Sequence, residues 1–283
     1  MAPLDLDLQR IKADIQNSPS LHTWVTEVLL FDQIDSTNRV GMQMGSEGYP
    51  GGILILAEEQ TMGRGRLNRV WHSPKGVNLY LSLLIRPHLP QRDFPLFSLA
   101  TAVALVNAIQ SDTGFSCVVK WPNDILFEDK KIAGILLDSG GPSGRSESVT
   151  VAHHKMSHSS RGYLVVGIGI NVNWEKEEIP DDINATSLKI ISGHPVDRND
   201  LIRAILEALA AQFSLLEHGG KGLCIQALSD VCATLTKPVV VHTPHESTQG
   251  IAEKILENGE LLLRLPDGTK RKILLGDVTH LRS

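Results

Sequence analysis

A short apolar run followed directly by a loop of alternating glycines and arginines constrains this chain more than any other feature. The run Ile53–Ala57 predicts a buried strand, and the loop that follows it, Glu58–Arg66, ends in Gly-Arg-Gly-Arg. Glycine lets backbone N–H groups approach a ligand, and a guanidinium binds anionic oxygens through paired donors. The loop therefore predicts a site for a phosphate or carboxylate group. It is not a P-loop, because GxxxxGK[ST] does not occur in the sequence.

The composition is that of an ordinary soluble globular protein, with 42% hydrophobic and 21% charged residues. Its 283 residues are enough for one large and one small domain, or for two medium ones. The net charge of −5 gives no support to nucleic-acid binding. The three cysteines show neither metal nor disulfide spacing, which favours a reducing, cytoplasmic setting. No apolar run approaches the length of a membrane span, and the N-terminus reads as neither a secretory signal nor a transit peptide.

The pattern predicts three parts: an N-terminal extension over residues 1–22, a main domain over 23–235 and a small β domain over 236–283. One short helix is expected in the extension, at Asp7–Gln16. In the main domain, apolar residues at helical spacing predict helices over Ser98–Gln110 and from Asp197 to Glu217, and another follows the cap residues Asp35–Thr37. Further runs predict the strands Val77–Arg86, Val118–Trp121, Asp124–Glu128, Ile132–Asp138 and Tyr163–Ile170.

Two regions are expected to be loop or β structure outside this core. Residues 139–161 are rich in Gly, Ser and His and separate two predicted strands, so we expect an exposed, mobile hairpin loop. Its histidines (His153, His154 and His158) are expected to be solvated rather than metal ligands, because no local carboxylate or cysteine partners them. From Pro238 onward, the turn signals Asn258-Gly259 and Asp267-Gly268 predict hairpins in a small barrel.

Four further segments are polar where a buried core would favour apolar residues. Each alone has an ordinary structural explanation, such as a helix cap, a turn, or a glycine that relieves crowding in a strand. Their occurrence in one order together with the Gly-Arg loop is hard to explain by chance. They are Asp35–Asn38 (DSTN), Lys120–Asp124 (KWPND), Lys131–Leu136 (KIAGIL) and Gly167–Asn171 (GIGIN).

In these motifs the chain resembles the biotin–protein ligases, over roughly residues 30–225 for the catalytic body and 236–283 for a small barrel. The resemblance implies an α+β fold: a mixed sheet with helices packed on one face, related to the class II aminoacyl-tRNA synthetase core, plus an SH3-like β-barrel. It also implies an ATP-dependent ligase that activates biotin as biotinyl-5′-AMP and transfers it to a lysine of a biotin carboxyl carrier protein. ATP and Mg²⁺ would be used and pyrophosphate released.

The implied chemistry accounts for the charged residues of the motifs. Biotin's carboxylate must attack the α-phosphorus of ATP although both groups are anions, so cations must hold them together. The motifs contain four such cations: Arg64, Arg66, Lys120 and Lys131. By resemblance Lys131 is the main catalytic residue, with Arg66 beside it. Asp124 is our candidate to orient or deprotonate the carrier lysine.

The resemblance assigns the remaining site residues either to biotin or to ATP. Hydroxyl and amide side chains suit a ureido ring, which offers two N–H donors and one carbonyl acceptor, and glycines leave room for the bicyclic ring. The implied biotin-binding set is Ser36, Thr37, Asn38, Gln60, Gly63, Arg64, Gly65, Arg66, Lys131, Gly134, Gly167 and Gly169. The implied ATP-binding set is Arg64, Arg66, Trp71, Lys120, Asn123, Lys131 and Asn171. Asn123 and Asn171 would face the phosphates or their metal, whose protein ligands the sequence does not define.

The loop departs from the pattern of many relatives, because Leu67-Asn68-Arg69 stands where they have a residue followed by Gly-Arg. Asn68 tolerates left-handed backbone better than most residues, so the turn is expected to survive. Arg64 and Arg66, rather than Arg69, are therefore the arginines expected to act in the site. We also expect the loop to be mobile without ligand and to close over the adenylate.

Three alternative functions fit the motifs less well. A DNA-binding regulator is disfavoured, because the first motif begins at Asp35 and leaves no room for a winged-helix domain of the kind some relatives carry. A lipoate or octanoate ligase or transferase on the related fold would lack the Gly-Arg loop beside KWPND. A non-catalytic biotin-binding or scaffold protein would not need Lys131, Arg64, Arg66 and Asn123. The implied partner is the apo carrier domain of a carboxylase, without nucleic acid or membrane, and monomer and homodimer both stay open.

Overall fold

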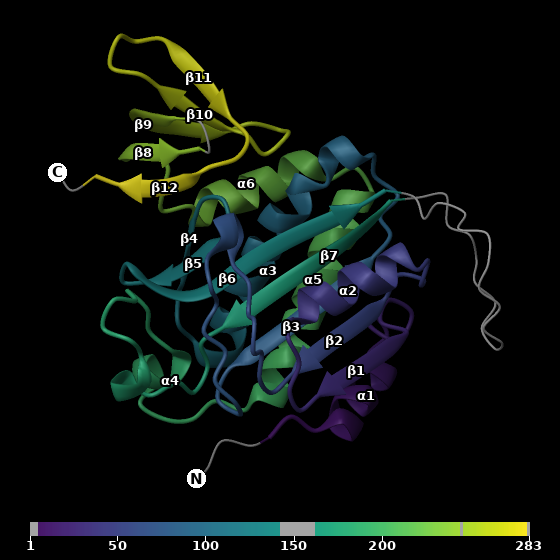
Figure 1. Cartoon of the computed structure of the whole chain (residues 1–283). Coiled ribbons are helices and arrows are strands. Elements are labelled where there is room, and N and C mark those ends of the chain that lie inside the picture. Colours follow the sequence, from purple (N-terminus) through teal and green to yellow (C-terminus); the bar gives the residue numbers. More distant parts are fainter. Residues whose placement is uncertain (1–4, 142–161, 244–245, 282–283) are drawn as a thin grey trace.

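The computed structural model describes residues 5–141, 162–243 and 246–281. They form a seven-stranded sheet with helices against it and a separate five-stranded sheet near the C-terminus (Figure 1). Sequence patterns for strands with flanking helices and for a β-rich tail therefore predict the overall arrangement correctly. The predicted boundary between the main domain and the tail stays a prediction.

The main sheet is mixed, with strand order β1-β2-β3-β7-β6-β5-β4. Only β1 and β2 are parallel, and every other neighbouring pair is antiparallel. The strands are β1 Glu27–Phe31, β2 Ile53–Ala57, β3 Leu79–Ile85, β4 Val118–Lys120, β5 Asp124–Phe127, β6 Lys130–Gly140 and β7 Tyr163–Ile170.

Helices cover both faces of this sheet, so the expectation of helices on one face only is wrong. Side chains alternate between the two faces of a strand. On β2, Leu54 and Leu56 point into the main core with α3 and α5, whereas Ile53 and Ile55 pack against α2. The helices are α1 Leu8–Asn17, α2 Thr37–Ser46, α3 Pro95–Thr113, α4 Leu188–Ser192, α5 Arg198–Glu217 and α6 Lys221–Val231. The short α2 covers only part of its face and leaves the remainder for the site (Figure 1).

The segment that includes α3 contradicts the expectation that no apolar run approaches the length of a membrane span. The stretch Gln91–Thr113 is long and apolar enough to cross a membrane by length and composition, although no such run was expected from the sequence. Most of its apolar window is buried inside the protein, as in the core helix of a globular domain. The predicted helix, Ser98–Gln110, was too short at both ends. Because α3 is buried nearly all round, its ends show no apolar periodicity that would mark them.

The two strands that flank the insertion, β6 and β7, pair antiparallel as far as Gly140 and Tyr163. The expected exposure and mobility of this loop concern residues 142–161, which lie outside the described residues. The same holds for His153, His154 and His158.

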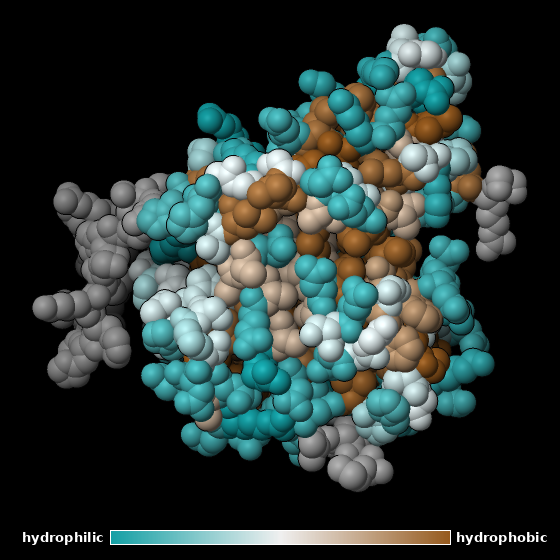
Figure 2. Space-filling view, turned by 180° about the vertical axis from the view of Figure 1, so that it is seen from behind, coloured by the Kyte–Doolittle hydropathy of each residue, from teal (hydrophilic) through white to brown (hydrophobic). Residues whose placement is uncertain are grey.

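The second sheet has strand order β11-β10-β9-β8-β12, and all its neighbouring pairs are antiparallel. Both predicted turns are present, with positive φ at Gly259 (86°) and Gly268 (84°). The first turn packs on α3, and the indole N–H of Trp121 donates to the Gly259 carbonyl at 3.3 Å. The strands are β8 Pro238–His242, β9 Ser247–Ile255, β10 Leu261–Arg264, β11 Lys270–Ile273 and β12 Asp277–His280. Figure 2 shows the opposite side of the molecule, where apolar patches are interrupted by polar side chains.

Candidate active site

A β-bulge in β6 brings Lys131 onto the open face of the main sheet. Ile125 of β5 pairs with Ala133, but Leu126 pairs with Lys131, so Ile132 is an extra residue in β6. Both Ile132 and Ala133 enter the core, while Lys131 and Gly134 share the opposite face. Bulges of this kind redirect side chains beside active sites. Lys131 is therefore a half-buried strand residue, and the exposed turn residue is its neighbour Lys130.

Two glycines form a notch in this open face. Gly134 and Gly169 pair directly across β6 and β7, between Tyr80 on β3 and Asp124 on β5. We call them the glycine notch. The indole of Trp71 lies in it, because a Cβ atom built on Gly169 would come within 2.4 Å of the ring and one on Gly134 within 2.9 Å. The notch thus exists because neither strand carries a side chain there.

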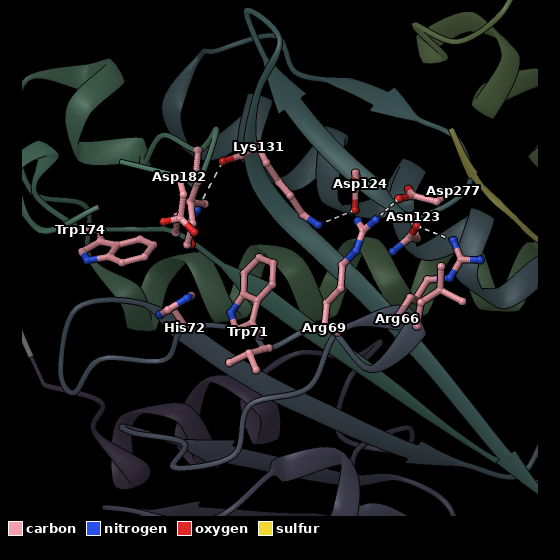
Figure 3. Close-up of a pocket in the computed structure, with 16 residues that line it drawn as sticks. Arg66, Arg69, Trp71, His72, Asn123, Asp124, Lys131, Trp174, Asp182 and Asp277 are labelled. Atoms are coloured by element: carbon pink, nitrogen blue, oxygen red, sulfur yellow. Dashed lines mark hydrogen bonds and ion pairs between the residues drawn. The ribbon is translucent and has the colours of Figure 1, made fainter. Parts of the chain in front are cut away.

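Trp71 also contacts the cation of the site. The Lys131 ammonium lies 5.2 Å from the centroid of the indole ring, and it forms an ion pair with Asp124 at 2.7 Å. Figure 3 shows the three side chains converging from β5, β6 and the loop. The indole N–H is buried and has no hydrogen-bond partner among the described residues. Such a group costs about 1–3 kcal/mol, so the indole is held there by packing and by the cation.

The Gly-Arg loop, residues 63–71, is itself a tight hairpin. Its backbone bonds run from the Gly65 N–H to the Arg69 carbonyl and from the Trp71 N–H to the Gly63 carbonyl. A Cβ on Gly63 would lie 2.3 Å from the Trp71 carbonyl oxygen, so only glycine fits there. Leu67 has a left-handed backbone in this turn, with φ 54°.

The arginines of the loop point to different neighbours. Arg66 donates to the Asn123 side-chain oxygen at 2.8 Å, and Arg64 lies 3.6 Å from the Asp138 carboxylate. Burial lowers the pKa of Arg66, and the carboxylates of Asp277 and Asp124 partly oppose this effect. An arginine stays protonated in proteins, so Arg66 supplies a permanent cation beside Asn123.

A nearly filled polar pocket lies beneath the loop at the N-terminus of α2. This inner pocket has about 50 Å³ of free space. Thr37 and Asn38 are buried, and so is Ser36, whose side chain makes no helix-capping bond. The Thr37 N–H instead donates to the Gln60 side-chain oxygen at 2.9 Å. Gly167 accommodates Asn38, since a Cβ there would lie 1.8 Å from the amide oxygen. The inner pocket is lined by Ser36, Thr37, Asn38, Gln60, Arg64, Gly65, Arg66, Trp71, Lys131, Gly134, Gly167 and Gly169, among others.

A larger cavity of about 390 Å³ opens on the other side of Trp71 (Figure 3). This open cavity contains Arg66, Asn123, Asp124, Lys131 and Asn171, which the sequence motifs had singled out. The sequence did not predict the other labelled side chains of this cavity as site residues, apart from a lesser role for one of them, Arg69. They are Arg69, His72, Trp174, Asp182 and Asp277. Trp174 was the most detectable of these, because it stands three residues after the GIGIN motif.

A third space, the outer cleft, has about 760 Å³ and separates the main sheet from the C-terminal sheet. It is lined by Lys120, Asp124 and Lys131 on one side and by Lys237 and His280 on the other. Lys120 therefore lies in this cleft and does not line the open cavity or the inner pocket, although it belonged to the implied ATP-binding set.

Asn171 lies at the edge of the open cavity, but its amide is already engaged. It donates to the carbonyls of Lys131 at 3.3 Å and Thr186 at 3.1 Å. These bonds fix the backbone at Lys131. No group of three or more His, Cys, Asp or Glu residues in the described part of the chain is arranged to hold a metal ion.

The comparisons with known proteins identify one family. The model of the biotin/lipoate A/B protein ligase family matches residues 30–155. The bifunctional ligase/repressor BirA of Bacillus spizizenii is 34% identical over 87% of this chain and 72% of its own length. The biotin–[acetyl-CoA-carboxylase] ligase of Paracoccus denitrificans is 31% identical over 83% of this chain and 92% of its own.

Solved structures show the same relationship. The biotin protein ligase from Aquifex aeolicus, in complex with biotin and ATP, is 26% identical, with a TM-score of 0.72. The match covers 91% of this chain and 100% of that structure. With the family model and the relatives above, it leads to one conclusion: the chain belongs to the biotin–protein ligases of the biotin/lipoate A/B protein ligase family.

Proposed function

We propose that this protein activates biotin with ATP as biotinyl-5′-AMP and transfers the biotinyl group to a lysine of a carrier protein. One observation carries the proposal: the inner pocket, the open cavity and the outer cleft all meet at Lys131. A ligase of this class brings three reactants to one point, and three spaces around one ammonium group match that requirement.

Each space suits one reactant. The inner pocket has the hydroxyl and amide groups that a ureido ring needs. The open cavity has Arg66, Asn123 and two tryptophans, Trp71 and Trp174, which suit phosphates and a purine base. The outer cleft leads from solvent to Asp124 and gives a carrier lysine a path to the same point.

In the first step, a carboxylate oxygen of biotin attacks the α-phosphorus of ATP. The bond from that phosphorus to the bridging oxygen breaks, and pyrophosphate leaves. Lys131 and Arg66 offset the repulsion between the two anions and the charge that builds on the phosphoryl oxygens. The ion pair with Asp124 holds the Lys131 ammonium in place before the reactants arrive.

In the second step, the amine of the carrier lysine attacks the acyl carbonyl, an amide forms and AMP leaves. The amine must lose a proton, and Asp124 faces the outer cleft from which it would enter. We assign Asp124 to orient this amine and accept its proton. Its contact with Lys131 couples the two half-reactions, because a change in one partner alters the position of the other.

Four finer assignments belong to the same proposal. Mg²⁺ usually keeps several waters and takes one or two carboxylates together with substrate phosphates. The oxygen donors of Asp182 and Asn123 in the open cavity fit an ion held mainly by the nucleotide. The carrier is assigned as a biotin carboxyl carrier domain, met in the cytoplasm. We assign the five-stranded sheet to an SH3-like barrel.

The test is biotin-dependent exchange of radiolabelled pyrophosphate into ATP, followed by biotinylation of a purified carrier domain. We expect exchange with biotin and none with octanoate or lipoate. Exchange that depends on octanoate or lipoate would instead identify the related acyl ligase. No exchange with any of these acids would contradict an adenylate-forming enzyme altogether.

A further inference from the structure

One buried side chain holds both the first and the last residue of the connection between β2 and β3. This connection, residues 58–78, contains Gln60 and the Gly-Arg loop. Arg198, the first residue of α5, donates through Nη1 to the Glu58 carboxylate at 2.6 Å and to the Asn78 carbonyl at 3.1 Å. An NH₂ group carries two hydrogens, so one nitrogen can serve both ends at once. We call Arg198, Glu58 and Asn78 the loop clamp.

The loop clamp lies on the face of the main sheet that is turned away from the site. Leu54 and Leu56 of β2 point into the core, and the Glu58 side chain continues this alternation and meets α5 on the same side. Arg198 and Asn78 are fully buried, and Glu58 is 8% exposed. Neither Arg198 nor Glu58 lines the inner pocket, the open cavity or the outer cleft. The two residues can therefore act on a substrate only through the connection that they hold.

Both oxygens of the Glu58 carboxylate have donors in this arrangement. One accepts from Arg198 Nη1, and the other accepts from the Leu6 N–H at 2.8 Å and from Arg198 Nη2 at 3.3 Å. Two parallel N–H donors fix the orientation of a guanidinium against a carboxylate, which a point charge does not do. The Glu58 end of the connection is thus held in one geometry, with a contribution from the segment that precedes α1.

The backbone bonds at the ends of the connection are longer than those of a regular ladder. The Gly76 N–H donates to the Glu58 carbonyl at 3.2 Å, and the Gln60 N–H donates to the Ser73 carbonyl at 3.4 Å. Such bonds are commonly about 2.9–3.0 Å long. Gln60 stands two residues after Glu58 and accepts from the Thr37 N–H at 2.9 Å. A shift at Glu58 therefore moves a side chain of the inner pocket.

We propose that Arg198 and Glu58 are positioning residues for the ligase reaction, which fix the ends of the β2–β3 connection so that Gln60 and the Gly-Arg loop meet biotin and ATP. The inference rests on the proposed function, in which this connection contacts both substrates. Weakening the loop clamp should accordingly weaken substrate binding and leave the chemistry at Lys131 intact.

The test uses two substitutions that keep the charges. Arg198→Lys replaces the planar fork with a compact ammonium that cannot bridge both ends, and Glu58→Asp withdraws the carboxylate by one methylene group. In pyrophosphate exchange we expect the KM for biotin and for ATP to rise about tenfold in each variant, as loss of a hydrogen bond to a charged group predicts. The kcat should change by less than about twofold. Amide hydrogen exchange over residues 59–77 should be faster in both variants without any ligand.

Asp93→Asn is the matched control. Asp93 is 7% exposed, close to the value for Glu58, and forms an ion pair with Lys221 at 2.7 Å. Loss of this pair destabilises the fold away from the β2–β3 connection, so both KM values should stay as they are in the unmodified protein. A merely structural role for Arg198 would give the same pattern, because less folded enzyme lowers the apparent kcat and leaves each KM unchanged.

Unchanged KM values or unchanged amide exchange in Arg198→Lys and Glu58→Asp would overturn the inference. If Arg198→Lys does not fold, Glu58→Asp decides between these outcomes. Absence of pyrophosphate exchange in the unmodified protein would instead contradict the proposed function, and the amide measurement would still test whether the loop clamp holds the connection.

Discussion

Arg69 of the Gly-Arg loop and Asp277 of β12 form an ion pair that joins segments 208 residues apart in the sequence. Asp277 also lines the open cavity, so this pair connects the loop over the site to the C-terminal sheet. Arg69 is largely exposed, and exposed ion pairs contribute about 0–1 kcal/mol. That is enough to shift the position of a loop without affecting the stability of the domain.

Asp277→Asn should therefore release the loop. We expect trypsin to cut after Arg64, Arg66 or Arg69 up to about fivefold faster, since a loss of 1 kcal/mol changes an opening equilibrium by this factor. The thermal midpoint should not change. Arg264→Gln removes an ion pair to Glu253 elsewhere on the C-terminal sheet and should leave the cleavage rate unaltered. Biotin with ATP should protect the loop in the unmodified protein.

Lys131→Met should abolish most adenylate formation while the protein still binds biotin and ATP. Loss of one well-placed donor to a developing charge typically lowers the rate by about 10²–10³. Pyrophosphate exchange measures this step, and calorimetry measures binding. Lys130→Met, at the exposed neighbouring position of β6, is the control and should retain nearly full activity. Full-rate exchange by the Lys131 variant would exclude its assigned role.

Asp124→Asn should slow transfer to the carrier more than adenylate formation. The amide cannot accept the proton of the incoming lysine, but it keeps the size of the carboxylate. Single-turnover transfer from preformed biotinyl-5′-AMP and pyrophosphate exchange report on the two steps separately. Equal losses in both would show that Asp124 acts only by holding Lys131.

Gly169→Ala should weaken binding by about fivefold or more. The added Cβ would lie 2.4 Å from the Trp71 indole, so either the ring or the strand must move, and overpacking typically costs about 1–3 kcal/mol. Gly222→Ala is the control, because a Cβ on this α6 residue meets nothing within 4 Å. Titration of biotin and ATP with each variant tests this. Unchanged affinities in Gly169→Ala would show that the notch takes no part in binding.

His280 should make stability depend on pH. Burial, with Lys237 and Lys120 nearby, lowers the pKa of this imidazole in the folded protein. The unfolded chain therefore binds the proton more readily, and stability falls as the pH drops below the ordinary histidine value of about 6.5. Urea titrations at pH 7.5 and 5.5 should show a larger loss for the unmodified protein than for His280→Gln. Equal losses would contradict this assignment.

The parts of the fold that the sequence predicted well are those where local pattern and burial agree. The bounds of β2 and β7 were predicted to the residue, because each is an apolar run between polar or glycine residues. Helix α6 was missed because only Cys224 and Leu228 in it are buried, which leaves no regular apolar stripe. Strand β1 was missed because it is a short edge strand with one buried residue.

Prediction of the site was limited by contacts that sequence spacing does not report. The fold brings the motif residues Lys131, Asp124, Arg66 and Asn123 to one cavity. The motifs did not identify Asp138, which reaches Asn38 across 100 positions of sequence. No local sequence pattern predicts that Lys131 lines the open cavity while Lys120 lines only the outer cleft. This difference depends on how β4, β5 and β6 pair.

The extra residue in β6 has a consequence for how the strand tolerates a change of register. A regular ladder over the same sequence would pair Ile132 with Leu126, and the alternation of side chains would then carry Lys131 into the hydrophobic interior. Such a slip could keep every motif residue and still lose the ammonium group to the wrong side of the sheet. In this strand, register matters as much as composition.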